Sequence, residues 1–367
     1  MKLVMIFSST LPTERAHGVQ IAKMCEAFAD CGVDVELIIS RKKLINDDIY
    51  KYYKVKNNFI ITQKWCVNFN NNYRIRYFSF LLNLIFSRIR KDCYIFTRYP
   101  EVAFLFSLLG YKVVFENHNW REDKKHKNLF LIKNVFLVVA TTKIIKNEYI
   151  INKFKEKKII VSPHGVDVDQ FNIQISKKEA REKLGIPFNK KIVLYSGHLY
   201  KQKGVYTIVE AAKQMSDEYL FIFVGGLEGD IKKLKKVADD CRNVNILGQK
   251  KPTEIPLYLK AADFLVIANS GKDEVERKYT APLKLFEYLV SGRIILASDV
   301  PAIREFLNDE TAIFFEPDNP QSLAQVIKGI DNDSEKQESI INNVRKIIKN
   351  LTWKNRAEKI IKSIELT

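Results

Sequence analysis

The sequence predicts an α/β protein with two Rossmann-like domains, each built around a doubly wound parallel sheet. Its 367 residues exceed the size at which one hydrophobic core stops growing, so two domains are expected. Short β-branched strands alternate with helical patterns along the whole chain, in two series separated by a charged stretch over residues 173–189. Apolar residues make up 46% of the chain, as in folded globular proteins.

The first series begins at the N-terminus. We expect a loop over residues 12–18 and then a helix, because Ile21, Met24, Cys25 and Phe28 recur at helical spacing before Gly32. The predicted strands are 2–8, 35–40, 94–97, 112–116, 136–140 and 158–161. Ligands of such sheets bind beyond the carboxyl ends of the strands.

The second series follows the 173–189 stretch, which is itself expected to be weakly ordered. Its predicted strands are 192–196, 221–224, 244–247, 264–267, 294–297 and 312–315. We therefore expect a first domain over residues 1–168 and a second over residues 169–352.

The cysteines and the N-terminus indicate a cytoplasmic protein. Five cysteines are scattered without any Cys-x-x-Cys spacing, which favours reduced thiols over a zinc site or a disulfide framework. The apolar run at residues 1–7 is short and lacks a small-residue cleavage site, so it is interpreted as a strand and not as a signal peptide.

The net charge is +17, and most of the surplus lies in the first half of the chain. Residues 1–165 hold 28 Lys and Arg against 14 Asp and Glu, whereas residues 166–367 hold 32 against 29. A basic half predicts a polyanionic partner, either nucleic acid or an anionic membrane face. A generally Lys-rich composition is the alternative explanation.

One segment favours the membrane. The apolar run over residues 78–86 is far too short to span a bilayer, so an interfacial helix on anionic lipid is expected. Four arginines flank it: Arg74, Arg76, Arg88 and Arg90. A core helix with solvated ends would explain the same pattern. We expect a peripheral protein on the inner face of the cytoplasmic membrane, with no nucleic-acid partner.

Residues 279–292 predict a helix whose start can bind phosphate. Thr280 is the expected N-cap, Pro282 lies in the first turn, and Gly292 follows the end. Free N–H groups and the helix dipole suit a diphosphate at such a start. Glu287, two turns in, can accept hydrogen bonds from ribose hydroxyls. An ordinary capped helix of an α/β domain is the alternative.

A second phosphate signature lies at residues 195–204. A glycine turn at Gly197 and the lysine Lys203 stand between a strand and a helix, where a lysine can act as a point charge on a diphosphate. Two further glycine turns end strands at Gly226 and Gly248.

Together these segments closely resemble the donor site of retaining glycosyltransferases of family 4. The resemblance runs from the Pro12 loop to Trp353 and implies a GT-B fold, with the last helix (about 353–367) packed back on the first domain. It implies that Glu287 grips the ribose, that Lys203 neutralises the leaving diphosphate, and that the donor is a nucleotide-diphosphate sugar with no other cofactor. Donor contacts are implied for Gly18, Gly197, His198, Gly226, Gln249, Thr280, Ala281, Pro282, Leu283 and Lys284.

Two positions depart from that family. His198 stands where the family has an arginine, and Tyr279 stands where the first of two paired glutamates is usual. The acids Asp273, Glu274 and Glu276 lie nearby, and such clusters are usually solvated.

His118 is the catalytic candidate of the first domain. It follows the strand at 112–116, and the family places a histidine here beside the sugar. We expect it to act at the reaction centre without being a fold residue. Asp167 and Asp169 form an Asp-x-Asp pair, but they fall at the domain junction, so no metal site is expected.

The sequence thus predicts metal-independent retaining transfer of a sugar from a nucleotide sugar to a hydroxyl of a sugar or lipid-linked sugar, in polysaccharide or glycolipid synthesis. Two alternatives stay open: a sugar-nucleotide epimerase of the same fold, and a non-catalytic basic protein that binds polyanions. Donor base, donor sugar and acceptor cannot be predicted from these residues.

Overall fold

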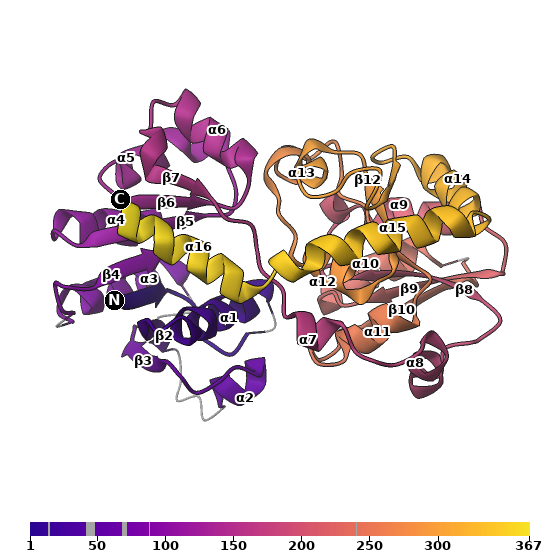
Figure 1. Ribbon diagram of the computed structural model, residues 1–367, viewed down its shortest axis with the longest axis horizontal. Coiled ribbons are helices and arrows are strands. Elements are labelled where there is room, and N and C mark those ends of the chain that lie inside the picture. The colour runs from indigo at the N-terminus through magenta and orange to yellow at the C-terminus, as the bar shows by residue number, and fades with distance from the viewer. Residues whose placement is uncertain (14, 42–47, 68–71, 88, 240) are drawn as a thin grey trace. The chain divides into compact units, whose positions relative to one another are not determined.

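The computed structural model describes residues 1–13, 15–41, 48–67, 72–87, 89–239 and 241–367. The chain divides into two compact units, each shown in Figure 1. The first comprises Met1–His164 together with Trp353–Thr367, and the second is Gly165–Thr352. The predicted boundary at residues 168 and 169 lies four residues beyond the observed one, and the last helix counts with the first unit.

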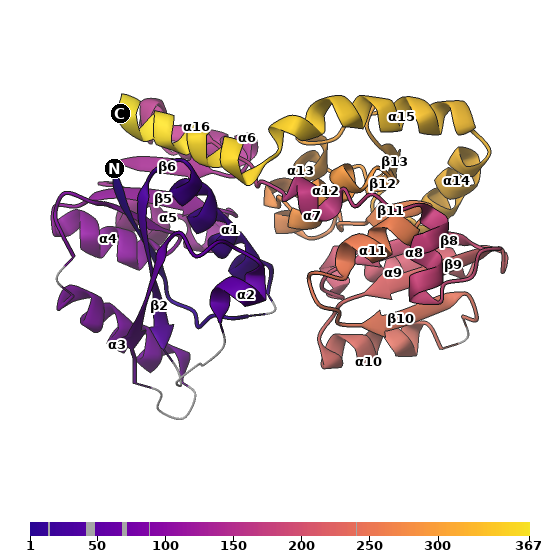
Figure 2. The ribbon, with the colours of Figure 1, turned by 60° about the horizontal axis from the view of Figure 1, so that its bottom comes forward.

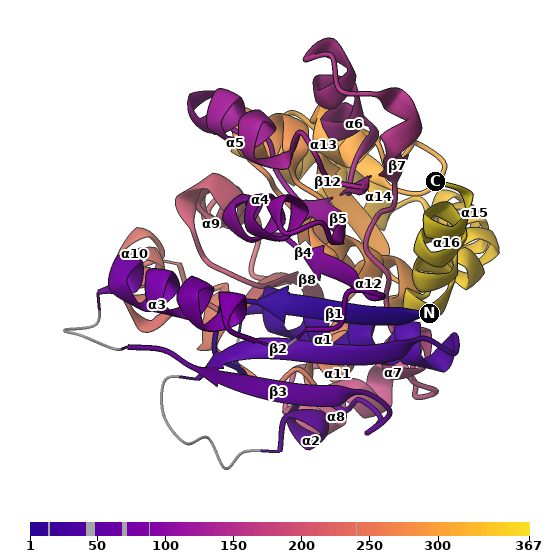
Figure 3. The same cartoon turned by 90° about the vertical axis from the view of Figure 1, so that its left-hand side faces the viewer.

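A seven-stranded parallel sheet forms the centre of the first unit, in the order β3-β2-β1-β4-β5-β6-β7 (Figure 3). Its strands are β1 (Lys2–Phe7), β2 (Asp34–Arg41), β3 (Ile60–Trp65), β4 (Tyr94–Thr97), β5 (Lys112–Asn117), β6 (Leu137–Ala140) and β7 (Ile159–Val161). Strand β1 pairs in register with β2 from Lys2 opposite Asp34 onward. Six of these strands were predicted; the edge strand β3 was not, because Gln63 and Lys64 interrupt its apolar pattern.

Helices cover both faces of this sheet. They are α1 (Ala16–Asp30), α2 (Ile49–Tyr53), α3 (Tyr73–Ile85), α4 (Pro100–Leu108), α5 (Lys125–Ile132), α6 (Lys143–Ile151) and α16 (Trp353–Leu366), with single turns η1 (Glu122–Lys124) and η2 (Glu156–Lys158). Helix α16 packs beside α1 (Figure 2). The buried Arg356 of α16 donates to the carbonyl oxygen of Pro163, which fixes the C-terminal helix to this unit.

A six-stranded parallel sheet forms the centre of the second unit, in the order β10-β9-β8-β11-β12-β13. Its strands are β8 (Lys191–Ser196), β9 (Tyr219–Val224), β10 (Val244–Gly248), β11 (Phe264–Ile267), β12 (Ile294–Ser298) and β13 (Ile313–Phe315). All six predicted strands are confirmed. The two sheets confirm the predicted α/β class with two doubly wound domains.

The helices of the second unit are α7 (Val168–Phe171), α8 (Lys177–Leu184), α9 (Val205–Ala212), α10 (Glu228–Val237), α11 (Ile255–Ala261), α12 (Leu283–Ser291), α13 (Pro301–Arg304), α14 (Pro320–Asp331) and α15 (Ser334–Ile347). Shorter turns are η3 (Lys201–Lys203), η4 (Val275–Tyr279) and η5 (Ile348–Asn350). The core gathers the buried strands and the inner faces of α9, α12 and α14.

The prediction that residues 173–189 are weakly ordered is wrong. Helix α8 occupies it, because Ser176 and Glu179 cap its start reciprocally and Gly185 ends it with φ of 63°. Arg181 is buried and pairs with Asp263 at 2.5 Å, which attaches the helix to the sheet. The high charge of this stretch concealed a capped helix.

The predicted N-cap of the helix within residues 279–292 is also wrong. Helix α12 begins at Leu283 with Pro282 as N-cap, whereas Thr280 was the expected N-cap. The residues before it form the π-helical turn η4, which ends at Thr280 through a bond from the Thr280 N–H to the Val275 carbonyl at 3.0 Å. Pro282 has no N–H to donate, so the hydrogen bonding of η4 cannot continue through it. Helix α12 therefore forms as a separate helix after Pro282.

No helix in the described part of the chain is long and apolar enough to cross a bilayer. None of the five cysteines, all of which are described, forms a disulfide.

Candidate functional site

Three glycine turns join the carboxyl ends of β8, β9 and β10. The Gly197 N–H donates to the Val224 carbonyl at 2.8 Å, and the Gly225 N–H donates to the Gly248 carbonyl at 2.7 Å. A Cβ on Gly225 would lie 2.4 Å from the Gly197 carbonyl oxygen, so only glycine fits there. The turns therefore form one backbone-lined edge at the end of the sheet where ligands of this fold bind.

Lys203 stands at the entry to α9, in the turn η3. Gly204 follows it with φ of 69°, and a Cβ on Gly204 would lie 1.7 Å from the carbonyl oxygen of Ala268. The Ser270 N–H donates to the Gln202 carbonyl at 3.0 Å. These contacts press the lysine-bearing turn against the end of β11.

Glu276 is a site residue that the sequence did not single out. Its carboxylate accepts an ion pair from the Lys203 Nζ at 2.6 Å and a hydrogen bond from the Asn269 side chain. Only 6% of Glu276 is exposed, so this acid is not part of a solvated cluster. The π-helical turn η4 aims it inward, three residues before Tyr279, which is itself buried. The nearest signal in the sequence was the acid cluster from 273 to 276.

Lys284 lies at the start of α12 on the same side. Its Nζ sits 3.6 Å from the centre of the Tyr195 ring, a cation–π contact. Burial, followed by the neighbouring Lys203, holds the pKa of Lys284 well below its usual range, while Glu276 and Glu287 oppose that shift. Helix α12 is fixed to β8 because the Ser196 N–H donates to the Tyr288 hydroxyl at 2.8 Å.

Glu287 lies one turn further along α12 and is partly exposed. Burial raises its pKa to about 7, against the opposing effect of Lys284. Its carboxylate has no hydrogen bond or ion pair with any residue that the structure describes. A partly buried carboxylate without a protein partner is able to accept hydrogen bonds from ligand hydroxyls.

The remaining predicted donor residues of this unit lie around these groups. A Cβ on Gly197 would lie 3.3 Å from the Lys284 Nζ, which places the two side by side. His198 stacks on Tyr200 with ring centres 4.9 Å apart, and Gly226 packs against Leu199. Gln249 is exposed just after β10. Thr280, Ala281 and Pro282 form the turn that leads into α12, and Leu283 is the first residue of that helix.

His118 belongs to a buried network in the first unit. Its Nε2 lies 2.8 Å from Glu116, which also pairs with Arg98 at 2.6 Å and with Arg356. Burial alone would raise the pKa of Glu116, but Arg98 and Arg356 hold it well below its usual range. An ionised Glu116 accepts a hydrogen bond from the Nε2–H of His118, and this leaves Nδ1 as an acceptor.

The imidazole of His118 is therefore neutral near pH 7. Burial, followed by the charge of Arg98, lowers its pKa to about 4. It stacks on His164 with ring centres 5.0 Å apart, and His164 is in turn hydrogen-bonded to Gln20 at 2.8 Å. The side chain keeps 26% of its surface exposed. His118 is thus anchored in the fold and still accessible.

Gly18 lies inside the first turn of α1 and not in a loop. Its N–H donates to the Arg15 carbonyl at 2.9 Å, and a Cβ would lie 2.3 Å from the Tyr53 hydroxyl. The absent side chain allows Tyr53 to reach the Thr13 backbone, which it bonds at both N–H and carbonyl.

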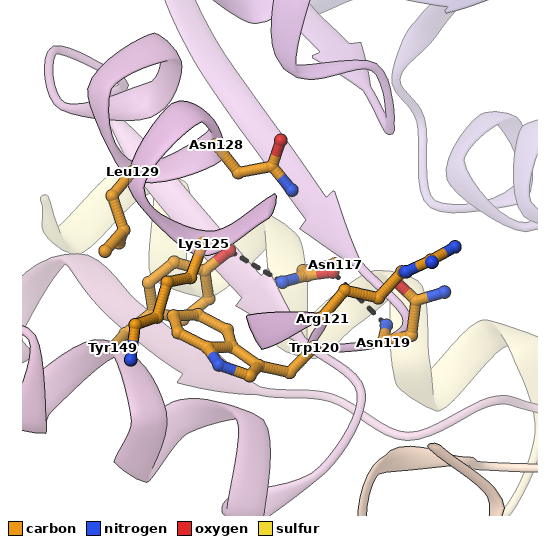
Figure 4. Close-up of a pocket in the computed structure, with 8 residues that line it drawn as sticks. All are labelled: Asn117, Asn119, Trp120, Arg121, Lys125, Asn128, Leu129 and Tyr149. Carbon is orange, nitrogen blue, oxygen red and sulfur yellow. Dashed lines mark hydrogen bonds between the residues drawn. The ribbon is translucent and has the colours of Figure 1, made fainter. Parts of the chain in front are cut away.

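A small polar pocket opens beside the end of β5 (Figure 4). Its empty volume is about 220 Å³, open solvent included. It is lined by Asn117, Asn119, Trp120, Arg121, Lys125, Asn128, Leu129 and Tyr149. The Asn117 amide donates to the Tyr149 hydroxyl at 2.7 Å, so the wall of the pocket is preformed.

The Asp-x-Asp pair forms a helix start. Asp167 accepts a hydrogen bond from the Gln170 N–H at 3.0 Å and caps α7. Among the described residues there is no group of three His, Cys, Asp or Glu side chains that could hold a metal ion.

Comparison with known proteins finds a family whose sequences resemble the second unit. Residues 176–347 match the family described as glycosyl transferases group 1. The matched range covers most of the C-terminal unit, Gly165–Thr352. Lys203, Glu276, Lys284 and Glu287 all lie within the matched range, whereas Gly18 and His118 lie outside it.

Two relatives carry names that place them in polysaccharide biosynthesis. TuaC of Bacillus subtilis, named for teichuronic acid biosynthesis, is 24% identical over 47% of this chain and 41% of its own length. WcaI of Escherichia coli, named for colanic acid biosynthesis, is 27% identical over 46% of this chain and 42% of its own length. The chain thus spans about two fifths of these curated relatives.

The fold of the whole chain has a close structural counterpart. HepE of Anabaena, solved in complex with UDP-glucose, superposes with a TM-score of 0.80, covers 100% of both chains and is 15% identical. HepE was also solved with UDP and glucose. At this identity the likeness confirms the GT-B fold expected from the sequence.

Proposed function

We propose that the protein is a retaining glycosyltransferase that moves a sugar from a nucleotide-diphosphate sugar to a hydroxyl of a sugar or lipid-linked sugar acceptor. The observation that carries the proposal is the pair of lysines, Lys203 and Lys284, beside the unpartnered carboxylate of Glu287 at the glycine-lined end of the sheet. The group 1 match over this unit and the UDP-glucose bound by HepE support it.

In this proposal, groups of the protein neutralise the negative charge that develops on the leaving diphosphate. Lys203 supplies positive charge where the diphosphate departs, Lys284 lies beside it, and the first turn of α12 adds N–H groups and its dipole. Glu287 accepts hydrogen bonds from the ribose hydroxyls. Because Lys203 and the helix start are already in place, no resident metal ion is required for the charge that develops on the diphosphate.

Glu276 gives Lys203 its position. The ion pair holds the Lys203 amine, and the Asn269 hydrogen bond holds the Glu276 carboxylate in turn. The amine is therefore aimed before the substrate arrives, which lowers the cost of ordering it in the transition state. His118 contributes from the first unit as a neutral hydrogen-bonding group for the sugar, since Glu116 fixes its tautomer.

Release of nucleoside diphosphate from a panel of nucleotide sugars, with and without sugar acceptors, tests the proposal. Acceptor-dependent release with the anomeric configuration retained is the expected result. Release without any acceptor requirement, together with an epimerised sugar, would indicate an epimerase. No release and no nucleotide binding across the panel would overturn the proposal in favour of a non-catalytic polyanion-binding protein.

A further inference from the structure

An apolar face stands exposed on the first unit, where helix α3 lies against the edge strand β3. We infer that this face docks on an anionic lipid bilayer. It is defined by five residues of α3 and its end and by two residues at the end of β3: Ile75, Phe78, Leu82, Ile85, Phe86, Trp65 and Val67. This set is called the α3 face below.

The α3 residues of this set share one side of the helix. Their spacing of three, four, three and one positions places them within an arc of about 100° on a helical wheel. Phe80 and Leu84 lie on the opposite side and are 0% and 1% exposed, so they form the core contact. The helix is therefore apolar on two sides, and only one of them is covered by the protein.

Exposure on this face is high for large apolar groups. Phe86 is 83% exposed, Trp65 is 63% exposed and Phe78 is 62% exposed. Scattered single residues of this kind are ordinary, but a contiguous set marks a contact surface. The helix is held in place because the Ser79 hydroxyl accepts from the Val67 N–H at 2.9 Å and the Asn83 amide donates to the Trp65 carbonyl.

The positive charge around the α3 face favours an anionic bilayer as its partner. Residues 49–91 contain nine Lys and Arg and no Asp or Glu. Arg74, in the first turn of α3, is exposed and forms no ion pair with any described residue, and the same holds for the partly exposed Lys64 of β3. A rigid apolar face with exposed aromatic rings and unneutralised cations suits the boundary between anionic headgroups and acyl chains.

The face revises the interface expected from the sequence. That expectation counted residues 78–86 as one apolar run, whereas the structure turns Phe80 and Leu84 inward and adds Ile75, Trp65 and Val67. Of the four flanking arginines, Arg88 lies outside the described residues, and Arg90 is already paired with Asp92 at 2.6 Å. Among the described residues, Arg74 and Lys64 remain available to lipid headgroups, and Arg76 is half-buried.

One consequence rests on the proposed function: a transferase held at a bilayer by its first unit meets acceptors anchored in lipid, so the lipid-linked sugar is the favoured acceptor class. The docking test itself needs neither donor nor turnover. Failure of vesicle binding and failure of sugar transfer are thus separate results.

The experiment is co-sedimentation of the full chain with vesicles of phosphatidylcholine, with and without phosphatidylglycerol. Binding is expected only with phosphatidylglycerol, and it should weaken as salt rises. The double variant Phe78→Ser/Phe86→Ser should lower the bound fraction at least tenfold, and Arg74→Glu/Lys64→Glu should do the same. Matched controls are Phe188→Ser, at a phenylalanine 56% exposed in the second unit, and Lys233→Glu/Lys236→Glu on α10.

Three results would overturn the inference. The wild-type chain failing to bind phosphatidylglycerol vesicles at low salt is one. Wild-type binding that the α3-face variants leave unchanged is another, because it would locate the contact elsewhere. A chain that sediments as a dimer, loses the dimer on Phe78→Ser/Phe86→Ser and ignores vesicles would assign the face to a second copy.

Discussion

Lys203 and Glu276 form a 2.6 Å ion pair between the turn that opens α9 and the π-helical turn that precedes α12. Both side chains are mostly enclosed, with 20% and 8% of their surfaces exposed. The pair fixes an amine at the end of a sheet where a diphosphate is proposed to leave. The pair also places the Glu276 carboxylate three residues before Tyr279, which stands where the resembled family usually has a glutamate.

Removing either proposed donor contact should slow the reaction. Lys203→Ala and Glu287→Ala are each expected to lower turnover at least tenfold, because losing a charged contact at an enclosed site costs roughly 1.5 to 3 kcal/mol. Steady-state kinetics and calorimetric titration with UDP measure this. Lys201→Ala, at an exposed lysine of the same turn, is the control and should behave as wild type. A folded Glu287→Ala protein that binds nucleotide as tightly as wild type would remove Glu287 from the site.

Glu276 should act through Lys203. Glu276→Gln keeps the shape but removes the charge, so turnover should fall, and adding it to Lys203→Ala should cause no further loss. A double-mutant cycle on kcat measures the coupling. Glu274→Gln changes an exposed acid of the same segment and serves as the control. Fully additive effects would mean that Glu276 does not position Lys203.

His118→Ala should lower kcat while leaving nucleotide affinity unchanged. The structure changes one part of the sequence-based expectation, which was that thermal stability would also be unaffected. His118 bonds Glu116 and stacks on His164, so its loss should cost about 1 kcal/mol and lower Tm by a few degrees. His118→Asn, which can keep a hydrogen bond, should recover more of the stability than of the turnover. If activity falls only in proportion to the fraction of folded protein, so that turnover per folded molecule is unchanged, His118 is a purely structural residue.

His118 should stay neutral through the physiological range. Its pKa of about 4 in the fold lies below the ordinary 6.5, so the unfolded chain binds more protons between these values. Stability from this site is therefore present above pH 6.5 and is lost as pH falls toward 4. NMR titration of the imidazole Cε1–H resonances, assigned by His118→Asn, should show no midpoint for His118 above pH 5. A midpoint near 6.5 would contradict the buried network.

Gly204 and Gly292 offer a matched pair for the turn after Lys203. Both have left-handed φ, 69° and 70°, but a Cβ on Gly204 would lie 1.7 Å from the Ala268 carbonyl oxygen, while Gly292 has open space. Gly292→Ala should cost about 1 to 2 kcal/mol for backbone strain. Gly204→Ala adds the clash, so its unfolding midpoint in urea should fall well below that of Gly292→Ala. Equal midpoints would show that the turn can move away from β11.

Much of the fold could be predicted because it is encoded locally. Of the thirteen strands in the described residues, twelve have mostly apolar sequences between turn residues, and each of these was placed within two residues of its observed ends. The glycine turns at Gly197, Gly226 and Gly248 and the helix ending at Gly292 were also evident, since left-handed φ favours glycine. Two doubly wound sheets followed from these elements. The GT-B class was implied by the family resemblance and is confirmed by the structural likeness to HepE. The site residues themselves stay predictions.

Only the tertiary structure decided which distant groups meet. Arg356 reaches Glu116 across 240 residues of sequence, and Glu276 pairs with Lys203 although the acid cluster that contains Glu276 was expected to be solvated. It also decided which side of α3 faces the core, because Phe80 and Phe78 are chemically alike and two positions apart. Hydrophobic periodicity in the sequence indicates which residues are apolar, and a turn residue such as glycine indicates a local backbone angle. Burial, ion pairing and pKa depend on neighbours that only the packed chain brings together.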